Sequence, residues 1–552
     1  MRVPVKSVLI LLYLAADGGA VAERVGSLGA SPSLIIYGGL YALLAAALFA
    51  AASIRSHPLR LLHAVLLAGS ALFIAASERI MGEHFSYDAF ITLFDSRGFV
   101  GDALGQHRGP IGWAVAVAAI LFAGIALPPQ RTVRWPGWVA TVPATALLML
   151  ATILFARGGE GARGLPGAYV PLSYALLLAY ETAQSGGGER RAVVLPRSGT
   201  PASGDIVLIV DESVGGNYLD LNAPGGARSG LAQRRPGVAM HNFGSAASIT
   251  NCSVGTNLTL RHGGTRADYR RINATMPAIW DYARKAGMGT AYIDAQRTGG
   301  ALQNLMTAEE RAAIDRFIQF DGVKVRDRDM AAADALAALL NDDVPQFILV
   351  NKVGAHFPIN DKYPDAYLRR RRALPRGGYE DISDTGSRAG FGGEAEDWRR
   401  YRNSYRNTLD WNVGAFFDRL FARADLSRAT LIYTSDHGQD LHERGRPGVN
   451  THCSGDPVME EGLVPLVVLA GEEAQGSAEW SRWAAANRGR ASHYQLFPTM
   501  LELMGYDPRA VRPVYGDPLT VPSADPMTFN ILFNARLGRS PEWRKVESGA
   551  RQ

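Results

Sequence analysis

An acidic residue and a histidine stand side by side directly after an apolar run. The run is Ala429-Thr430-Leu431-Ile432-Tyr433, and Thr434-Ser435-Asp436-His437-Gly438 follows it. In an open sheet of parallel strands, ligands collect at the carboxyl ends of the strands. A carboxylate and a neutral imidazole are both common zinc ligands. The pair alone is also typical of an ordinary surface histidine, so a metal site requires further ligands from other segments.

Four other segments carry side chains of matching chemistry. Each follows a β-rich run or lies in a loop of small and polar residues. A carboxylate at a strand end can instead cap a helix, and a Ser or Thr before a helix is usually a cap. A helix N-terminus also favours phosphate, because its N–H groups are free. The segments are Asp211-Glu212-Ser213, the loop Ser245–Ser253, Gly354-Ala355-His356-Phe357-Pro358 and Thr451-His452-Cys453.

From Asp205 onward, short β-rich runs alternate with helical stretches. This alternation predicts a mostly parallel sheet with helices on both faces. A charged surface insertion is expected over Arg369–Arg372 and the Gly- and acid-rich stretch 377–397. The expected strands are Ile206–Val210, Thr290–Ile293, Phe347–Val350, Thr430–Thr434 and Val464–Leu469, and the expected helices include Met276–Ala286, Arg328–Leu340 and Arg402–Arg423.

The first third of the chain has a different character. A transmembrane helix needs roughly 20 apolar residues, and four stretches without Asp, Glu, Lys or Arg meet this requirement. A fifth, Ser7–Ala22, carries Asp17 and two glycines, so it is either a span or an uncleaved signal-like segment. The four uncharged stretches are Ser33–Ala52, Leu61–Ser77, Gly109–Gln130 and Trp135–Ala156.

Basic residues predict the orientation of these spans. They lie before the first span, between the second and third, and between the fourth and fifth, which makes these places cytoplasmic under the positive-inside rule. Five spans then put everything after Arg157 on the outer side. We expect a transmembrane domain over residues 1–160 with an aromatic-rich amphipathic segment near 78–108 on the outer surface. An interfacial helix and linker would cover 161–204, and a catalytic domain 205–552.

Charge and cysteine content narrow the functional classes. The net charge of +5 is modest and spread along the chain, so we expect no nucleic-acid partner. Only two cysteines occur, Cys252 and Cys453. In an oxidising compartment they could form one disulfide, and two free thiols are the alternative.

The order and surroundings of these candidate residues resemble those of the alkaline phosphatase/sulfatase-like superfamily. More narrowly, the chain resembles membrane-bound phosphoethanolamine transferases, which modify lipid A and other envelope glycans. Those proteins have five spans, an amphipathic segment after the third, and a large periplasmic catalytic domain. The motifs that carry the resemblance are Ser248–Ser253, Tyr405–Thr408, Ser435–Gly438, Val464–Leu466 and Ser492-His493.

The resemblance implies a fold, a cofactor and roles for individual residues. It implies an alkaline-phosphatase-like α/β/α sandwich and a bacterial inner-membrane protein whose catalytic domain is periplasmic. Thr250 would be the nucleophile, and Glu212, Thr250, Asp436 and His437 would bind one zinc ion, in preference to manganese. His356 and His452 would bind a second zinc or the phosphate and acceptor. If the site assembles in this way, a Cys252–Cys453 bridge would tie the nucleophile loop to the His452 loop, and two free thiols are the alternative.

The implied reaction is the transfer of phosphoethanolamine from the phospholipid phosphatidylethanolamine to lipid A or another envelope glycan, by a monomer, through phospho-Thr250. The chain departs from the family in having few cysteines and in carrying Asp211 where a glycine is common. A sulfatase is disfavoured because Cys252-Ser253-Val254-Gly255-Thr256 lacks the Pro and Arg of the sulfatase motif. The alternatives are a phosphoglycerol transferase, a phosphodiesterase of the same fold, and a non-catalytic membrane sensor.

Overall fold

The computed structural model describes residues 5–81, 84–95, 107–128, 136–185, 190–198, 204–378, 380, 391–445 and 449–547. The chain divides into two compact units. A helical unit comprises Met1–Phe94, His107–Gly187 and Ala535–Ser540. An α/β unit comprises Asp95–Gln106, Gly188–Asn534 and Pro541–Gln552.

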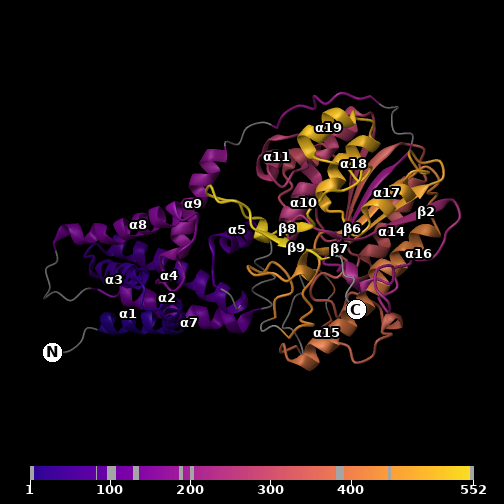
Figure 1. Ribbon diagram of the computed structural model, residues 1–552. Coiled ribbons are helices and arrows are strands. Elements are labelled where there is room, and N and C mark those ends of the chain that lie inside the picture. The colour runs from indigo at the N-terminus through magenta and orange to yellow at the C-terminus, as the bar shows by residue number, and fades with distance from the viewer. Residues whose placement is uncertain are drawn as a thin grey trace. The chain divides into compact units, whose positions relative to one another are not determined.

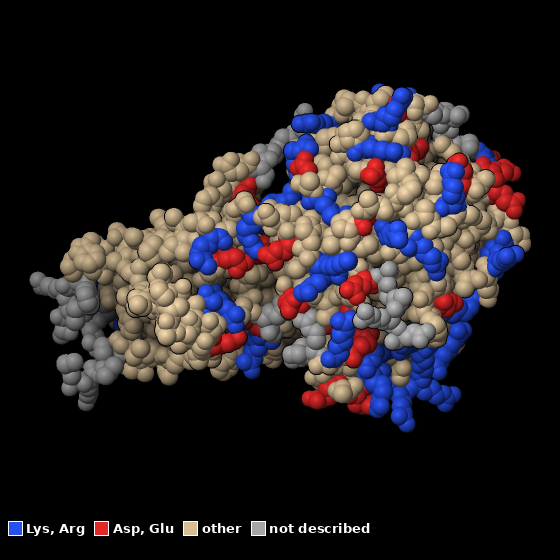
Figure 2. Space-filling view, in the orientation of Figure 1, with Lys and Arg blue, Asp and Glu red and all other residues tan. Residues whose placement is uncertain are grey.

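Four helical segments of the helical unit are long and apolar enough to cross a membrane. They are α3 (Pro32–Ser53), α4 (His57–Met81), α7 (Arg108–Ala126) and the pair η2 and α8 (Gly137–Ala156). Their mean hydropathies lie between 1.9 and 2.1. On the face shown in Figure 2, much of this unit carries no charged side chain. Exposed apolar residues such as Ile35 and Leu148 suit contact with lipid.

The first predicted span is a bent pair of helices. Helix α1 (Val5–Ala16) and helix α2 (Gly18–Leu28) meet at an angle of 55°. The break falls at Asp17, which precedes Gly18 and Gly19. By length and composition, the described residues therefore contain four candidate spans, or five if the bent pair crosses as one.

The aromatic segment near 78–108 packs partly inside the helical unit. Helix α4 extends to Met81, and α5 covers Tyr87–Asp95. Phe85 and Phe90 are buried and lie within 6.1 Å of the Tyr174 ring, centroid to centroid. Tyr174 belongs to α9 (Val170–Ser185), the helix expected between the last span and the linker. Residues 96–106 lie outside the described part.

The α/β unit contains a seven-stranded, mostly parallel sheet, as predicted. The strand order is β2-β7-β6-β1-β5-β3-β4. Strand β1 pairs in parallel with β5 and β6, and β3 pairs in parallel with β4 and β5; β7 is antiparallel to both β6 and β2. The strands are β1 (Ile206–Asp211), β2 (Val238–Ala247), β3 (Gly289–Asp294), β4 (Arg316–Gln319), β5 (Gln346–Asn351), β6 (Thr430–Ser435) and β7 (Leu463–Gly471).

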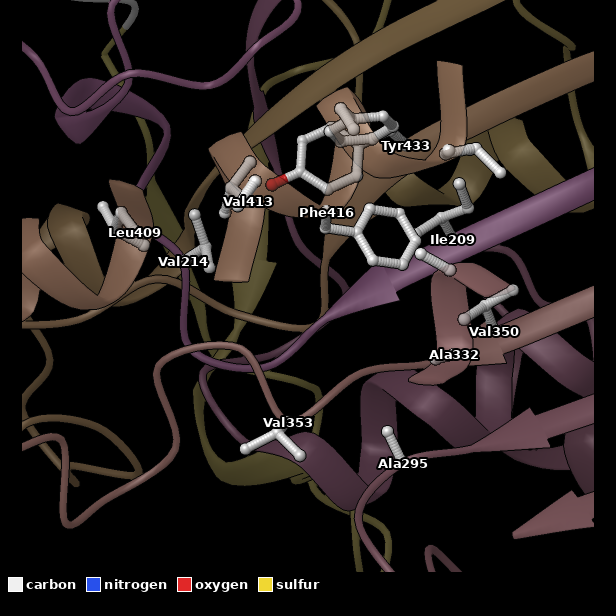
Figure 3. Close-up of a cluster of buried hydrophobic side chains, with 14 of the residues drawn as sticks. Ile209, Val214, Ala295, Ala332, Val350, Val353, Leu409, Val413, Phe416 and Tyr433 are labelled. Atoms are coloured by element: carbon white, nitrogen blue, oxygen red, sulfur yellow. The ribbon is translucent and has the colours of Figure 1, made fainter. Parts of the chain in front are cut away.

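Helices cover both faces of this sheet, because the central strands are apolar on both sides. Val207 and Ile209 of β1 join one core, and Leu208 and Val210 join the other. Figure 3 shows part of the first core, in which Ile209 and Val350 lie close to Phe416. In Figure 1, α14 (Arg328–Leu340), α15 (Ala395–Leu409) and α16 (Phe416–Phe421) lie on one side of the sheet. On the other side are α10 (Ser253–His262), α11 (Tyr269–Thr275), α18 (Leu496–Leu503) and α19 (Pro508–Tyr515).

Other elements differ from the prediction in extent. The helix expected over Arg402–Arg423 begins earlier, at Ala395, and is interrupted by a π-helical turn at Asp410–Ala415 before α16. The remaining elements are α12 (Ile279–Lys285), α13 (Ala308–Ala312), α17 (Trp480–Asn487), and a small antiparallel pair, β8 (Thr528–Asn530) and β9 (Trp543–Lys545).

Candidate metal centre

Strand pairing brings the first three predicted ligands together. Strands β1 and β6 are parallel neighbours, with Asp211 opposite Ser435, so Glu212 and Asp436 leave the sheet side by side. One potential ligand atom from each of Glu212, Asp436 and His437 lies within 4.8 Å of the others, and all three residues are buried. The Nε2 atom of His437 is 3.4 Å from a Glu212 oxygen and 3.7 Å from Asp436 Oδ2.

The donor set fits a cation. Asp436 Oδ1 accepts hydrogen bonds from the backbone N–H groups of Ser213 (3.0 Å) and His437 (2.7 Å). Asp436 Oδ2 is buried and has no hydrogen-bond partner among the residues that the structure describes, and such a group needs an explanation, for example a bound ion. Two carboxylates and one imidazole are ligands that zinc accepts.

The pKa values of these groups reflect the same crowding of charge. Burial, then the neighbouring charge of Glu212, raises the pKa of Asp436 to about 7. Burial opposes charge on His437, but the carboxylates of Asp436 and Glu212 prevail and raise its pKa to about 9. Burial would also raise the pKa of Glu212, yet the hydrogen bond and charge of His437 lower it below its ordinary value.

Neighbouring groups orient two of the ligands. His437 Nδ1 lies 2.7 Å from the carbonyl oxygen of Gly438, which favours a proton on Nδ1 and leaves Nε2 toward Glu212. Gln296, which follows β3, donates through Nε2 to Glu212 Oε2 (3.2 Å) and to the Lys352 carbonyl (2.8 Å). The imidazole and the carboxylate are therefore held toward the same point.

The other two predicted histidines lie near this cluster. The His452 ring stacks on the His437 ring with centroids 4.4 Å apart. Burial, then the charge of His437, lowers the pKa of His452 to about 3. Burial also lowers the pKa of His356, opposed by the charge of Glu212, and His356 Nδ1 lies 2.5 Å from the Phe357 carbonyl. Both imidazoles are thus neutral near pH 7.

Thr250 is fully buried, and its hydroxyl bonds to groups outside the ligand cluster. Thr250 Oγ1 accepts a hydrogen bond from the backbone N–H of Phe533 (3.1 Å) and lies 3.4 Å from Asn251 Oδ1. Asn251 Oδ1 also accepts from the backbone N–H of Leu532 (2.9 Å). Leu532 and Phe533 both have positive φ, a conformation that costs on the order of 1–3 kcal/mol for such residues. A strained C-terminal segment therefore covers the predicted nucleophile.

The hydroxyl that touches the cluster belongs to Ser253, the first residue of α10. Ser253 Oγ is 3.1 Å from His437 Nε2 and 3.2 Å from Glu212 Oε1. The sequence motif contains this serine, but its spacing did not distinguish it from a helix cap. Sequence reasoning also missed Gln296 and Phe533, because only the folded chain brings them to the site.

The loop that carries Thr250 is tied to the loop that carries His452. In the structure, Cys252 and Cys453 form a disulfide, and the Cys453 N–H donates to the Asn251 carbonyl (2.9 Å). Asn251 Nδ2 donates to Glu461 (2.9 Å). Burial raises the pKa of Glu461 to about 7. Two segments about 200 residues apart in sequence are thus held together beside the cluster.

Asp211, the departure noted in the sequence, points away from the ligands. It is fully buried, and its carboxylate lies 2.9 Å from Lys352 Nζ and accepts from the Tyr433 hydroxyl (2.9 Å). His493 is also buried and lies 2.7 Å from the Thr434 hydroxyl, which agrees with a structural role. His442 stacks on Trp398 at 3.9 Å.

The chain is similar to proteins of known family and structure. Residues 205–506 match the sulfatase family model. No match was found among curated protein sequences. The integral membrane protein lipooligosaccharide phosphoethanolamine transferase A from Neisseria meningitidis has a similar structure, with 17% identity and a TM-score of 0.63. The similarity covers 90% of this chain and 95% of that chain.

The C-terminal periplasmic domain of EcEptC from Escherichia coli is similar at 18% identity and a TM-score of 0.49, over 63% of this chain and 95% of that chain. The likeness to the N. meningitidis protein confirms the predicted fold class, a helical domain followed by an α/β domain with a mostly parallel sheet. Because the family match covers more than half of the chain, this protein belongs to the sulfatase family, as its motifs predicted.

Proposed function

We propose that this protein is a metal-dependent phosphoethanolamine transferase of the bacterial inner membrane. The donor is phosphatidylethanolamine, and the acceptor is lipid A or another envelope glycan. The observation that carries the proposal is the buried cluster of Glu212, Asp436 and His437 beside a loop with two candidate hydroxyls, Thr250 and Ser253, in a sulfatase-family domain. That domain follows four or five apolar helices, which suits a reaction on lipids.

Zinc fits this donor set better than magnesium or manganese, because imidazole ligands suit zinc and the harder ions prefer oxygen. A zinc ion bound by Glu212, Asp436 and His437 would lower the pKa of a nearby hydroxyl and neutralise charge on phosphate oxygens. One such ion is proposed, and the nearby His356 and His452 leave room for a second.

In the first step, Thr250 Oγ1 attacks the phosphorus of the donor. A threonine alcohol needs activation, and here the Phe533 N–H faces the oxygen on which negative charge develops. The new bond joins Thr250 to phosphorus, the bond from phosphorus to the glycerol oxygen breaks, and the leaving diacylglycerol receives the threonine proton. In the second step an acceptor hydroxyl attacks phosphorus and Thr250 regains its proton.

His356 is suited to proton exchange with the acceptor, and His452 to hydrogen bonding. Lowered pKa values keep both rings neutral near pH 7. A pKa of about 3 makes His452 a weak base, so we assign the acceptor's proton to His356. Excluding water from Thr250 during the reaction would protect the covalent intermediate, as a transferase requires.

We place the catalytic domain in the periplasm, and no nucleic acid takes part. A reporter enzyme fused after Gly204 tests this topology: it should be active only outside the cytoplasm. Cytoplasmic activity of the reporter would contradict it.

The decisive experiment is mass spectrometry of envelope lipids and glycans from cells with active protein or with the Thr250→Ala variant. We expect one acceptor to gain the mass of phosphoethanolamine only with the active protein. A gain equal to glycerol phosphate would instead assign a phosphoglycerol transferase. No gain on any envelope component would refute a transferase and leave a hydrolase or a sensor.

A further inference from the structure

We propose that Ser253 is a direct ligand of the metal, in the place that the family resemblance gives to Thr250. The inference rests on the proposed metal-dependent function and adds a residue to its site. It starts from the positions of three atoms that face one another: Ser253 Oγ, Glu212 Oε1 and His437 Nε2.

These three atoms form a nearly regular triangle. The sides are 3.1 Å from Ser253 Oγ to His437 Nε2, 3.2 Å from Ser253 Oγ to Glu212 Oε1, and 3.4 Å from His437 Nε2 to Glu212 Oε1. For zinc bonds of about 2.0–2.1 Å, two ligand atoms of a tetrahedron lie about 3.3 Å apart. The triangle therefore has the size of one face of a tetrahedral zinc site.

Asp436 would supply the fourth ligand atom of the tetrahedral site. Its Oδ2 atom lies 3.7 Å from His437 Nε2 and accepts no hydrogen bond from the described part of the chain. The other carboxylate oxygen of Asp436 is already bonded to two backbone N–H groups, so only Oδ2 remains for a cation. Glu212, Ser253, Asp436 and His437 then supply four ligand atoms.

The surroundings of the two hydroxyls support this division of roles. Thr250 Oγ1 is engaged by the Phe533 N–H and lies beside Asn251 Oδ1. Ser253 follows the disulfide-bonded Cys252 and begins α10, so the disulfide and the helix hold its backbone in place. Ser253 Oγ, Glu212 Oε1 and His437 Nε2 face one point, at which a metal ion would accept a lone pair from each.

The assignment has a functional consequence. A neutral hydroxyl is the weakest of the four ligands, so a phosphate oxygen of the donor can displace it. Catalytic zinc sites keep one position for water or substrate, and Ser253 would hold that position until the donor arrives. Thr250 then remains free of the metal in the resting enzyme and acts as the nucleophile.

Cobalt substitution of the full-length protein in detergent tests the ligand directly. A thiolate bonded to Co²⁺ gives an intense charge-transfer absorption that a nearby but unbonded thiol does not. We expect this band in the Ser253→Cys variant and not in the wild type, whose cysteines are paired. The Thr250→Cys variant is measured for comparison. A charge-transfer band in the Ser253→Cys protein supports the proposal whether or not the Thr250→Cys protein also gives one. A band only in the Thr250→Cys variant, or in neither, overturns it.

Two controls keep the test decisive. A non-reducing peptide map establishes that the introduced thiol is unpaired. If Ser253→Cys does not fold, Ser253→Ala and Ser253→Thr replace it: the alanine variant should bind Co²⁺ at least about tenfold more weakly, with a changed visible spectrum, and the threonine variant like the wild type. An unchanged spectrum and an unchanged Co²⁺ affinity in the alanine variant would show that Ser253 is not a metal ligand.

Failure of the inference and failure of the function give different results. If wild-type protein binds cobalt and transfers phosphoethanolamine but the serine variants show no ligand effect, only the role of Ser253 is wrong. If wild-type protein binds no stoichiometric metal, the metal-dependent function and the ligand are both wrong.

Discussion

Replacing Lys352 with methionine should destabilise the α/β unit strongly. The Lys352 side chain is fully buried behind the metal centre, where its ammonium lies 2.9 Å from Asp211 and 3.9 Å from Asp329. It also donates to the Asn412 carbonyl (2.5 Å) and lies 4.2 Å from the ring centroid of Phe416, in the apolar core of Figure 3.

The size of the effect follows from what remains after the substitution. Asp211 keeps its bond from the Tyr433 hydroxyl, and Asp329 keeps two backbone N–H donors, from Val353 and Gly354. Both carboxylates lose the ammonium of Lys352, and the charge of Lys362 still acts on Asp329. Breaking a buried pair in this way costs about 3–5 kcal/mol. For a domain of this size we expect a melting temperature about 5–10 °C lower.

Thermal unfolding of the full-length protein in detergent, followed by tryptophan fluorescence, measures this change. The matched control is the double variant Lys352→Met/Asp211→Asn, which removes one of the stranded charges. We expect the double variant to recover at least about 2 kcal/mol, as coupling between contacting residues does. A single variant within about 1 kcal/mol of wild type, or a double variant no more stable than the single one, would refute the reasoning.

Three further predictions concern the cofactor, the pH dependence and the C-terminal segment. Chelation should abolish transfer, and zinc should restore it better than magnesium; equal recovery with magnesium would contradict the proposed ligands. Burial raises the pKa of Asp205 from 3.8 to about 7, so the folded state holds this proton more tightly and stability falls as pH rises through that window. The stability advantage of Asp205→Asn over wild type should therefore grow by on the order of 2–4 kcal/mol in the free energy of unfolding between pH 4 and 8. A difference in melting temperature between the two proteins that does not change with pH would count against this. Gly255→Ala should lower the rate of transfer, because the new Cβ would lie 2.5 Å from Phe533 Cγ; faster transfer with higher stability would mean that only helix propensity matters there.

The sequence predicted the central strands of the sheet better than its edge strands. Strands β1, β3, β5, β6 and β7 appear as apolar runs because neighbours on both sides and helices on both faces bury them. The two strands that were not predicted, β2 and β4, are the outermost in the sheet. Partly exposed edge strands contain polar residues, such as Arg316 and Gln319 in β4, and so carry no continuous apolar signal.

Some residues of the candidate site could likewise be predicted from the sequence, and others could not. Glu212, Asp436 and His437 follow predicted strands, so the topology alone brings them together. Ser253 and Phe533 cannot be assigned in this way, because a serine at a helix start is usually a cap and a backbone N–H leaves no mark in the sequence.

The central claim is that Thr250 carries the transferred group. Protein incubated with phosphatidylethanolamine in the absence of acceptor, then acid-quenched and digested, should yield a peptide containing Thr250 that is heavier by one phosphoethanolamine group. Fragmentation must assign the modification to Thr250, and the Thr250→Ala protein must lack it. Modification at Ser253 instead, or none while transfer to acceptor proceeds, would contradict the account.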